Sequence, residues 1–240
     1  MNRLAWPLTV MSGEPLTYGE SSERVYCSYS DRYLKRSLAP SEYKTALSGE
    51  VIIPFRNRER LENEVACLKY IREKTDIPVP EVLAAYEENG SFYVWTELMK
   101  GVPMKELKES DRLKVMPEIR KHLATLQALR SNKTGGPSGI LCPPYMVTQH
   151  CDPDMSWLQI SAKDDIFVFC HRDLSDSNIL VDPVTLKVVA IIDWEYAGYY
   201  PKEHEIPYYE RSKPSGAQLK YFPQIVEQIK KFWEDSASTE

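Results

Sequence analysis

The sequence lacks long hydrophobic runs. Its uninterrupted apolar stretches, such as Ile166–Cys170 and Val188–Ile192, have five residues, whereas a membrane-spanning helix needs about 20. The N-terminal stretch is interrupted by Pro7 and lacks the longer apolar core of a signal peptide. We therefore expect a cytoplasmic protein that is not secreted and has no membrane partner.

An excess of positive charge is also lacking. The chain has 30 Lys and Arg against 35 Asp and Glu, a formal net charge of −5, whereas nucleic-acid-binding domains usually carry a basic surface. The composition therefore argues against a nucleic-acid partner. The five cysteines are odd in number and show no C-x-x-C spacing, which indicates reduced thiols rather than a disulfide framework or a zinc site.

The first hundred residues read as strands around one helix. Residues 16–38 alternate between apolar and polar and predict a hairpin or meander of strands. Apolar residues recur at helical spacing over 58–74, which predicts a helix that ends before Pro78. Two further strands are expected at 82–86 and 92–97, joined by a turn at Asn89-Gly90.

After Gly101 and Pro103 the pattern changes. We expect a helix over about 111–130 whose inward face comprises Leu113, Met116, Ile119, Leu123, Leu126 and Leu129. Three apolar strands should follow at 166–170, 179–181 and 188–192, and a last helix at roughly 217–233. At about 150 residues per domain, 240 residues make one large domain or two small lobes. The change of pattern predicts an α+β chain with a lobe over 1–99 and a lobe over 100–240.

The strongest chemical signal lies in one loop and the strand hairpin behind it. His171-Arg172-Asp173-Leu174, followed after three residues by Asn178, matches the kinase catalytic-loop pattern H-R-D-L-x-x-x-N. In phosphoryl transfer a carboxylate such as Asp173 accepts the proton of the attacking hydroxyl, and an amide oxygen such as that of Asn178 binds Mg²⁺. Asp193 ends an apolar strand and supplies a second metal-binding carboxylate. Each residue alone could merely cap a turn or end a strand, but together, at this spacing and between strands, they favour the catalytic interpretation.

The segment HRDLSDSNILVD followed by IIDWEYAG resembles the aminoglycoside phosphotransferase (APH) and choline-kinase-like family. The resemblance implies a two-lobed protein-kinase-like fold. Its N-terminal lobe (1–99) would have an antiparallel sheet and one main helix, and its C-terminal lobe (100–240) would be mostly helical. It also implies ATP or GTP with Mg²⁺, and phosphoryl transfer to a hydroxyl of a small molecule. Asp173 would be the base, and Asn178 and Asp193 the metal ligands.

The resemblance also implies nucleotide-binding residues. Lys35 would bind the phosphates with Glu64 as its partner, and Glu97 and Met99 would hold the base. The phosphate-covering loop would lie at 18–22, with Gly19, Ser21 and Ser22. That loop has no G-x-G-x-x-G pattern, and Glu20 and Glu23 beside it carry the wrong charge for phosphates, so weak nucleotide affinity is expected.

Two alternatives to a small-molecule kinase remain open. A kinase-fold binding protein with little or no turnover is suggested by the glycine-poor loop. A protein kinase is suggested by Arg172, where the family usually has glycine, although no A-P-E motif follows Asp193. The acceptor pocket should be lined by loops around 131–165 and 195–212. Acids in those loops leave a cationic acceptor open: Asp152, Asp154, Asp164, Asp165, Glu195, Glu203, Glu205 and Glu210.

Overall fold

The structure, a computed structural model, describes residues 13–144, 158–211 and 222–237. The chain divides into two compact units, Met1–Leu61 with Pro80–Leu98, and Glu62–Val79 with Met99–Glu240. The expected division into lobes at residues 99 and 100 stays a prediction.

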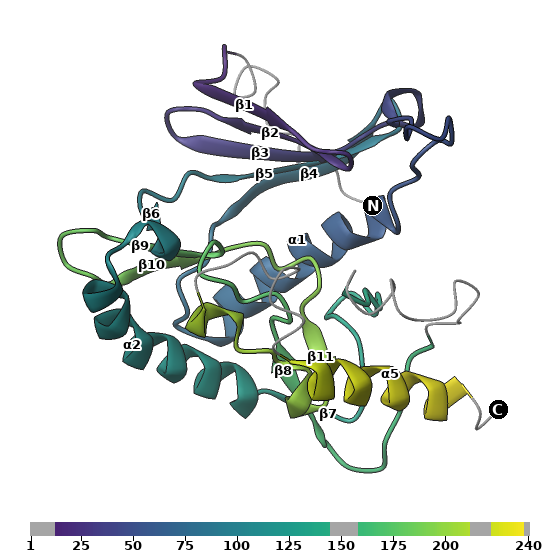
Figure 1. The fold of residues 1–240 in the computed structure, drawn as a ribbon, viewed down its shortest axis with the longest axis vertical. Helices are drawn as coiled ribbons and strands as arrows, with labels where there is room; N and C mark the ends of the chain where they lie inside the picture. The colour runs from purple at the N-terminus through teal and green to yellow at the C-terminus, as the bar shows by residue number, and fades with distance from the viewer. Residues whose placement is uncertain (1–12, 145–157, 212–221, 238–240) are drawn as a thin grey trace. The chain divides into compact units, whose positions relative to one another are not determined.

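The first unit contains a five-stranded antiparallel sheet in the order β1-β2-β3-β5-β4 (Figure 1). Its strands are β1 (Thr17–Glu20), β2 (Arg24–Ser28), β3 (Arg32–Ser37), β4 (Val82–Glu88) and β5 (Ser91–Glu97). Alternation along these strands buries Val25, Cys27, Leu34 and Trp95 together on one face. The expected meander over 16–38 and the two later strands are confirmed.

The tight turn between β4 and β5 confirms a second expectation. Asn89 has φ 50° and Gly90 has φ 78°, so both residues lie in the left-handed region. A two-residue type I′ hairpin requires this at both positions, and Asn-Gly is the residue pair that adopts it at least cost.

The helix α1 (Asn57–Lys74) begins in the first unit and is grouped with the second from Glu62 onward. Its bounds confirm the helix expected at 58–74. Leu61, Leu68 and Ile71 are buried along one side, as amphipathic spacing predicts. Beyond the helix, the Thr75 hydroxyl donates to Ile71 O at 2.8 Å, so the chain turns before Pro78.

Helices make up most of the regular secondary structure of the second unit, and short strands lie in the segments between them (Figure 1). One small antiparallel sheet has the order β10-β9-β6, and another has the order β11-β8-β7. The strands are β6 (Val102–Pro103), β7 (Arg130–Ser131), β8 (Phe167–Cys170), β9 (Ile179–Val181), β10 (Val188–Ile191) and β11 (Gly198–Tyr200). The three strands expected between residues 166 and 192 are thereby confirmed.

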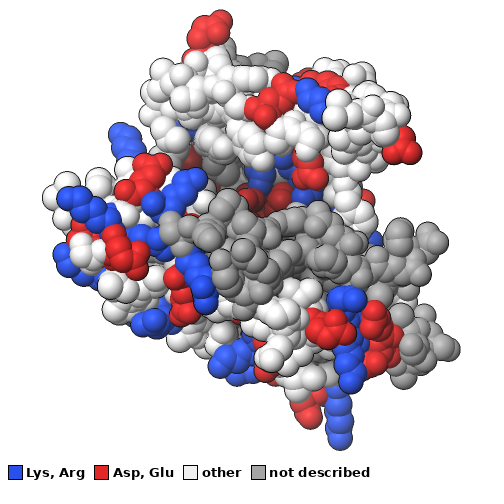
Figure 2. All heavy atoms as spheres, viewed as in Figure 1, with Lys and Arg blue, Asp and Glu red and all other residues white. Residues whose placement is uncertain are grey.

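The helix α2 (Glu109–Ala128) packs against β8 and β10. Met116, Ile119 and Leu126 are buried as expected, but Leu113 is 60% exposed, so its placement on the inward face is wrong. The neighbouring Arg112 is buried instead. On the side of the molecule where α2 lies, acidic and basic side chains are interspersed (Figure 2), and one such pair joins Lys114 to Asp111 at 2.7 Å.

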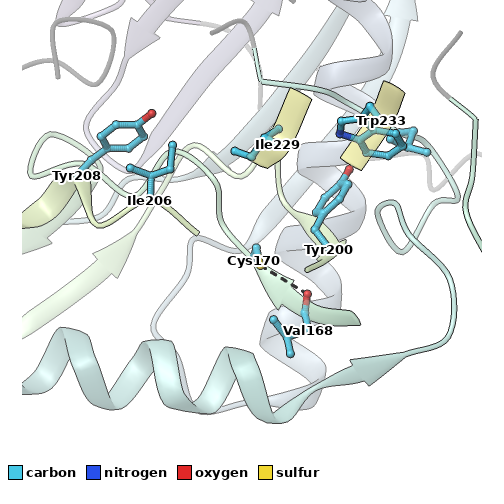
Figure 3. Close-up of a cluster of buried hydrophobic side chains, with 8 residues drawn as sticks. Val168, Cys170, Tyr200, Ile206, Tyr208, Ile229 and Trp233 are labelled. Carbon is cyan, nitrogen blue, oxygen red and sulfur yellow. Dashed lines mark hydrogen bonds between the residues drawn. The ribbon is translucent and has the colours of Figure 1, made fainter. Parts of the chain in front are cut away.

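The last helix, α5 (Pro223–Ala237), packs on a cluster of buried hydrophobic residues in the second unit. The expected start near residue 217 is corrected to Pro223 for the described part, and residues 217–221 lie outside it. Proline suits a first helical position, because its missing N–H has no intrahelical partner there. Figure 3 shows Ile229 and Trp233 of this helix with Val168, Cys170 and Tyr200.

Among the described helices, none combines the length and apolar character needed to cross a bilayer. The four described cysteines are buried and form no disulfide with one another, whereas Cys151 lies outside the described residues.

Ile229→Ala should lower the free energy of unfolding by about 2–5 kcal/mol, because it opens a cavity between α5 and the β8 strand. Gln228→Ala, on the exposed side of the same helix, should change it by less than about 0.5 kcal/mol. Urea unfolding of both variants measures the difference. Equal effects would show that α5 is not packed on this cluster.

Candidate active site

The loop from His171 to Asn178 joins the end of β8 to the start of β9. It is folded by short-range backbone bonds: Ser175 N donates to Asp173 O at 2.8 Å, and Asn178 N donates to Ser175 O at 3.0 Å. These two bonds close successive turns and bring the side chains of Asp173 and Asn178 to the same side.

The Asn178 amide is fixed by Asp173. Its Nδ2 donates to the backbone oxygen of Asp173 at 2.8 Å and to Asp173 Oδ2 at 3.2 Å. Because the amide nitrogen is used in this way, the amide oxygen is the atom left to bind a cation. The structure thus brings together two of the three residues of the predicted catalytic set.

Asp193 follows β10, which forms an antiparallel hairpin with β9, the strand that begins just after Asn178. Ile192 N donates to Asn178 O at 3.0 Å, which links the start of β9 to the residue before Asp193. Asp193 has φ 67°, in the left-handed region, so the chain turns sharply as it leaves β10. Its carboxylate lies in a group with those of Glu64 and Glu195, whose oxygens are all within 4.8 Å of one another.

This carboxylate group fits a hard divalent cation. Mg²⁺ prefers oxygen ligands and is typically held by one or two carboxylates, and Glu64, Asp193 and Glu195 offer three oxygens in close proximity. The sequence predicted Asp193 as a metal ligand and Glu64 as a lysine partner, and it placed Glu195 among the acids of the acceptor pocket. The association of these three carboxylates was not predicted.

The helix α1 explains how Glu195 comes to lie there. Asn63, one residue before Glu64, donates through Nδ2 to Glu195 O at 3.1 Å and to Ala197 O at 2.9 Å. Asn63 is completely buried, and the two carbonyls that its amide nitrogen contacts are more than 130 residues away in the sequence. In the sequence Asn63 stands in the polar run Glu62-Asn63-Glu64, where nothing sets it apart.

His171 connects the loop to the strand that ends at Asp193. Its Nε2 lies 3.0 Å from Ile192 O, and its Nδ1 accepts the Asp173 N–H at 3.3 Å. The ring is completely buried and lies 4.6 Å from the Trp194 ring, centroid to centroid. These contacts hold the His171 ring between the loop and the strand that precedes Asp193.

A buried ion pair holds the middle of the loop to α2. Arg112 NH2 lies 3.4 Å from Asp176 Oδ2, and both side chains are almost completely buried. The carbonyl of Asp176 also accepts the N–H of Lys105 at 3.1 Å. Neither Arg112 nor Asp176 was predicted to act at the site.

Arg172 has φ 68°, in the region that glycine adopts at least cost. This explains why glycine is common in the family at this position. The arginine is 1% exposed, its NH1 donates to Cys142 O at 3.2 Å, and its guanidinium lies 3.7 Å from the centre of the Tyr200 ring. These contacts offset the cost of a left-handed non-glycine residue, about 1–2 kcal/mol.

Two titratable residues lie behind the loop. Burial raises the pKa of Glu205 to about 7, against the opposing effects of backbone N–H bonds from His171 and Arg172 and of the Arg172 charge. Burial also lowers the pKa of His204 to about 2, and the Arg172 charge adds to this. His204 is therefore neutral at physiological pH.

Lys35 lies in β3, the middle strand of the sheet in the first unit, and is 7% exposed. Its register neighbours are Tyr26 on β2 and Val94 on β5. A lysine is rarely buried to this degree unless it is paired. Its pairing with Glu64 stays a prediction.

The predicted phosphate-covering loop is a strand end and a turn. Gly19 lies within β1 opposite Tyr26, and Ser21 and Ser22 lie between β1 and β2. The Ser21 hydroxyl oxygen accepts the N–H groups of Glu23 and Arg24 at 3.2 and 3.0 Å.

The two acids beside this turn are paired with cations. Glu20 contacts Lys44, and Glu23 lies 2.6 Å from Arg60 NH2. These pairs reduce the electrostatic penalty that the sequence predicted for a nearby phosphate.

At the other end of the sheet, Glu97 is the last residue of β5, and Met99 follows it outside the strand. The N–H groups of Glu97 and Leu98 donate to Glu81 O and Asp31 O, each at 3.0 Å. A base bound here must therefore use other backbone groups of this segment.

Parts of the predicted acceptor pocket lie outside the described residues. They are residues 145–157, with Asp152 and Asp154, and residue 212.

A family model described as a phosphotransferase enzyme family (APH) matches residues 12–206. No curated protein matches the sequence.

Several solved structures match the fold. The chain resembles aminoglycoside phosphotransferase APH(3'')-Id from Streptomyces rimosus with a TM-score of 0.57 and 16% identity, over 92% of this chain and 84% of the other. It resembles a thermostable mutant of APH(4)-Ia, solved with AMP-PNP and hygromycin B, with a TM-score of 0.54 and 15% identity, over 97% and 82%. It resembles aminoglycoside 2'-phosphotransferase-IIIa in its GDP complex with a TM-score of 0.53 and 12% identity, over 90% and 76%. Likeness at these identities confirms the expected α+β, two-lobed, kinase-like fold.

His204→Phe should make the protein less sensitive to acid. Below pH 6.5 the unfolded histidine binds a proton that the folded one, with its pKa near 2, does not bind, so wild-type stability falls as the pH falls. Phenylalanine keeps the ring next to Tyr200 and Phe232 and cannot titrate. Between pH 7 and pH 5 the variant should gain about 2 kcal/mol in unfolding free energy relative to the wild type.

Denaturant unfolding at both pH values measures this difference, and the contribution of Glu205 cancels because both proteins contain it. Parallel pH dependence of the two proteins would contradict a buried, neutral His204.

Proposed function

This chain belongs to the phosphotransferase enzyme family, and on that premise we propose that it transfers the terminal phosphoryl group of ATP to a hydroxyl group of a small molecule with the help of Mg²⁺. The observation that carries the proposal is the double hydrogen bond from the Asn178 amide to Asp173. It holds the carboxylate of Asp173 beside an amide oxygen that a cation could use as a ligand, at the start of the hairpin that ends near Asp193.

Asp173 is proposed as the catalytic base. The acceptor's hydroxyl proton passes to a carboxylate oxygen of Asp173 as the hydroxyl oxygen bonds to the γ-phosphorus. The bond between that phosphorus and the β–γ bridging oxygen breaks, so the products are a phosphate ester and ADP. Such reactions are accelerated mainly by positioning and by charge stabilisation, which accords with the hydrogen bonds that fix this loop.

Asn178 and Asp193 are the proposed metal ligands, and the carboxylate group of Glu64, Asp193 and Glu195 supports a cation at this place. Bound Mg²⁺ would neutralise the negative charge of the β- and γ-phosphates. The chain's own part is to hold the ligand oxygens in place, through the β9–β10 hairpin and through Asn63.

On the nucleotide side, Lys35 is proposed to bind the α- and β-phosphates, and its burial in the central strand supports a fixed position. Backbone groups of Glu97 and Met99 are proposed to hold the base, and the turn with Gly19, Ser21 and Ser22 to cover the phosphates. ATP and GTP both remain open, since the related proteins were solved with AMP-PNP and with GDP.

The acceptor is proposed to be a small alcohol, with cationic and neutral compounds as open classes. APH(4)-Ia was solved with hygromycin B, which makes aminoglycosides the first class to test. A coupled assay of ADP release over aminoglycosides, choline, ethanolamine, homoserine and sugars tests the proposed function. Mg²⁺-dependent release that requires one of these compounds supports it. An absence of release with all of them, although ATP binds, favours the alternative below.

One observation favours a second candidate, a kinase-fold binding protein with little turnover. The Ser21 hydroxyl oxygen accepts the N–H groups of Glu23 and Arg24. The turn therefore uses internally two N–H groups that a phosphate-binding loop would offer to its ligand. The third candidate, a protein kinase, rested on Arg172, which is buried against Tyr200 and Cys142 O. That position gives it no support as a receptor for an activation-loop phosphate.

Asp173→Asn should lower kcat by about 10²–10⁴-fold, the usual contribution of a general base. The substituted amide keeps the size of the side chain, so Mg-ATP affinity should change less than about threefold. Steady-state ADP release and calorimetric titration with Mg-AMP-PNP measure the two quantities. Asp76→Asn, at an exposed position of the same unit, should match the wild type. Unchanged kcat in Asp173→Asn would refute its role as the base.

Asp193→Asn should shift the Mg²⁺ dependence of turnover. One fewer negative ligand weakens a cation site, so half-maximal rate should require at least about tenfold more Mg²⁺. Asp76→Asn, exposed and outside the carboxylate group, serves as the matched control. A Mg²⁺ titration of ADP release compares the three proteins, and overlapping curves would remove Asp193 from the metal site.

A further inference from the structure

The ion pair at the middle of the catalytic loop joins two residue types that are rarely buried. Arg112 lies near the start of α2, and Asp176 lies between Asp173 and Asn178. NH2 of Arg112 is 3.4 Å from Oδ2 of Asp176, and both side chains are almost completely buried. A second carboxylate near Arg112, that of Glu109, lies 3.7 Å from NH1 and is largely exposed. Of these two acids, only Asp176 shares the buried environment of the guanidinium.

Stability does not explain this arrangement. Taking two charges out of water is costly, and buried ion pairs are often no more stable than apolar side chains of similar volume. Arg112 also lies near the N-terminus of α2, where the helix dipole favours negative rather than positive charge. What an ion pair adds over an apolar contact is a defined geometry between two groups. The pair is therefore better explained by what it fixes than by the stability that it adds.

The backbone of Asp176 is held by the same segment of the chain. Its carbonyl oxygen accepts the N–H of Lys105 at 3.1 Å, within the 3₁₀ turn Met104–Glu106 that precedes α2. Strand β6, directly before this turn, pairs with β9, with Pro103 opposite Leu180. The segment from β6 to the start of α2 therefore contacts both the backbone and the side chain of one loop residue.

That loop residue lies between the two side chains of the proposed site. Asn178 N donates to Ser175 O at 3.0 Å and so closes a turn around Asp176. The Asn178 amide then donates to both the backbone oxygen and the carboxylate of Asp173. The position of this amide relative to the Asp173 carboxylate therefore depends on the backbone at residue 176. A displacement of about 1 Å in such an arrangement can slow catalysis by about 10²-fold.

We propose that Arg112 and Asp176 form a positioning pair for phosphoryl transfer, which fixes the turn at residue 176 and thereby holds the Asn178 amide against Asp173. Both residues act through Asp173 and Asn178. The inference rests on the proposed function, because it requires these two residues to be the base and a metal ligand. The role needs the two charges, since an apolar pair of similar size would keep the packing but not the direction of the contact.

The double variant Arg112→Met with Asp176→Leu tests the proposal. It replaces both charges by apolar side chains of similar length or volume, so that no unpaired charge is left buried. The matched control is Lys114→Met with Asp111→Leu. It makes the same kind of replacement at an ion pair of the same helix, in which Lys114 is largely exposed.

Two measurements separate positioning from general packing. In assays of ADP release, kcat of the double variant should fall at least tenfold, and the half-maximal rate should require at least threefold more Mg²⁺, because the Asn178 amide is no longer held in place. Amide hydrogen exchange, followed by mass spectrometry, should become at least tenfold faster over residues 173–178 and remain unchanged over residues 115–128 of α2. The control should match the wild type in both measurements.

A double variant with the kcat of the wild type would overturn the inference, because an apolar pair would then serve equally well. A slower variant overturns it too if its Mg²⁺ dependence or its loop exchange is unchanged, or if α2 exchanges faster as well, since the loss then has another cause.

The failure of the proposed function has a different signature. A wild-type protein that releases no ADP and phosphorylates no acceptor would contradict the proposed function, and the inference with it. An active wild type with an unaffected double variant contradicts the inference alone. If the double variant does not fold, Asp176→Asn keeps the size of the side chain and removes its charge, and the same outcomes apply to it.

Discussion

The backbone of the catalytic loop turns at Arg172, a buried residue with a left-handed φ. This constraint determines much of what surrounds the loop. A buried turn leaves backbone N–H groups for which no neighbouring strand provides a hydrogen-bond acceptor. Glu205 receives two of them, and the His171 ring receives that of Asp173. The same ring lies within hydrogen-bond distance of Ile192 O, next to Asp193. The geometry of the two acids therefore depends on polar groups that lie behind the loop.

Elements whose information is local could be predicted from the sequence. The Asn89-Gly90 hairpin, the strands around the loop and the helix α1 all follow from short patterns, because turn chemistry and hydrophobic period act over a few residues. Asp173 and Asn178 were predictable for a similar reason. Their spacing of five residues is closed by backbone bonds within the loop, so the motif largely contains its own geometry.

Residues that act across long distances in the chain could not be predicted. Asn63 contacts Glu195 over 132 residues, and Glu205 contacts His171 over 34. Each is an ordinary polar residue in sequence, and only the fold gives it a buried partner. The error at Leu113 has a related cause: the helical pattern treated every leucine as inward-facing, whereas α2 turns Arg112 inward for its ion pair with Asp176.

The carboxylate group adds an energetic argument to the geometric one. Two unit negative charges 4.8 Å apart, the outer limit within this group, repel by about 3.5 kcal/mol at an effective dielectric constant of about 20. Three such carboxylates raise the energy of the folded state wherever positive charge does not offset them. A protein that keeps them together, with two of the three almost completely buried, stabilises any cation that enters. By linkage, that cation stabilises the fold in return. The stability and the proposed chemistry of this unit therefore depend on the same charges.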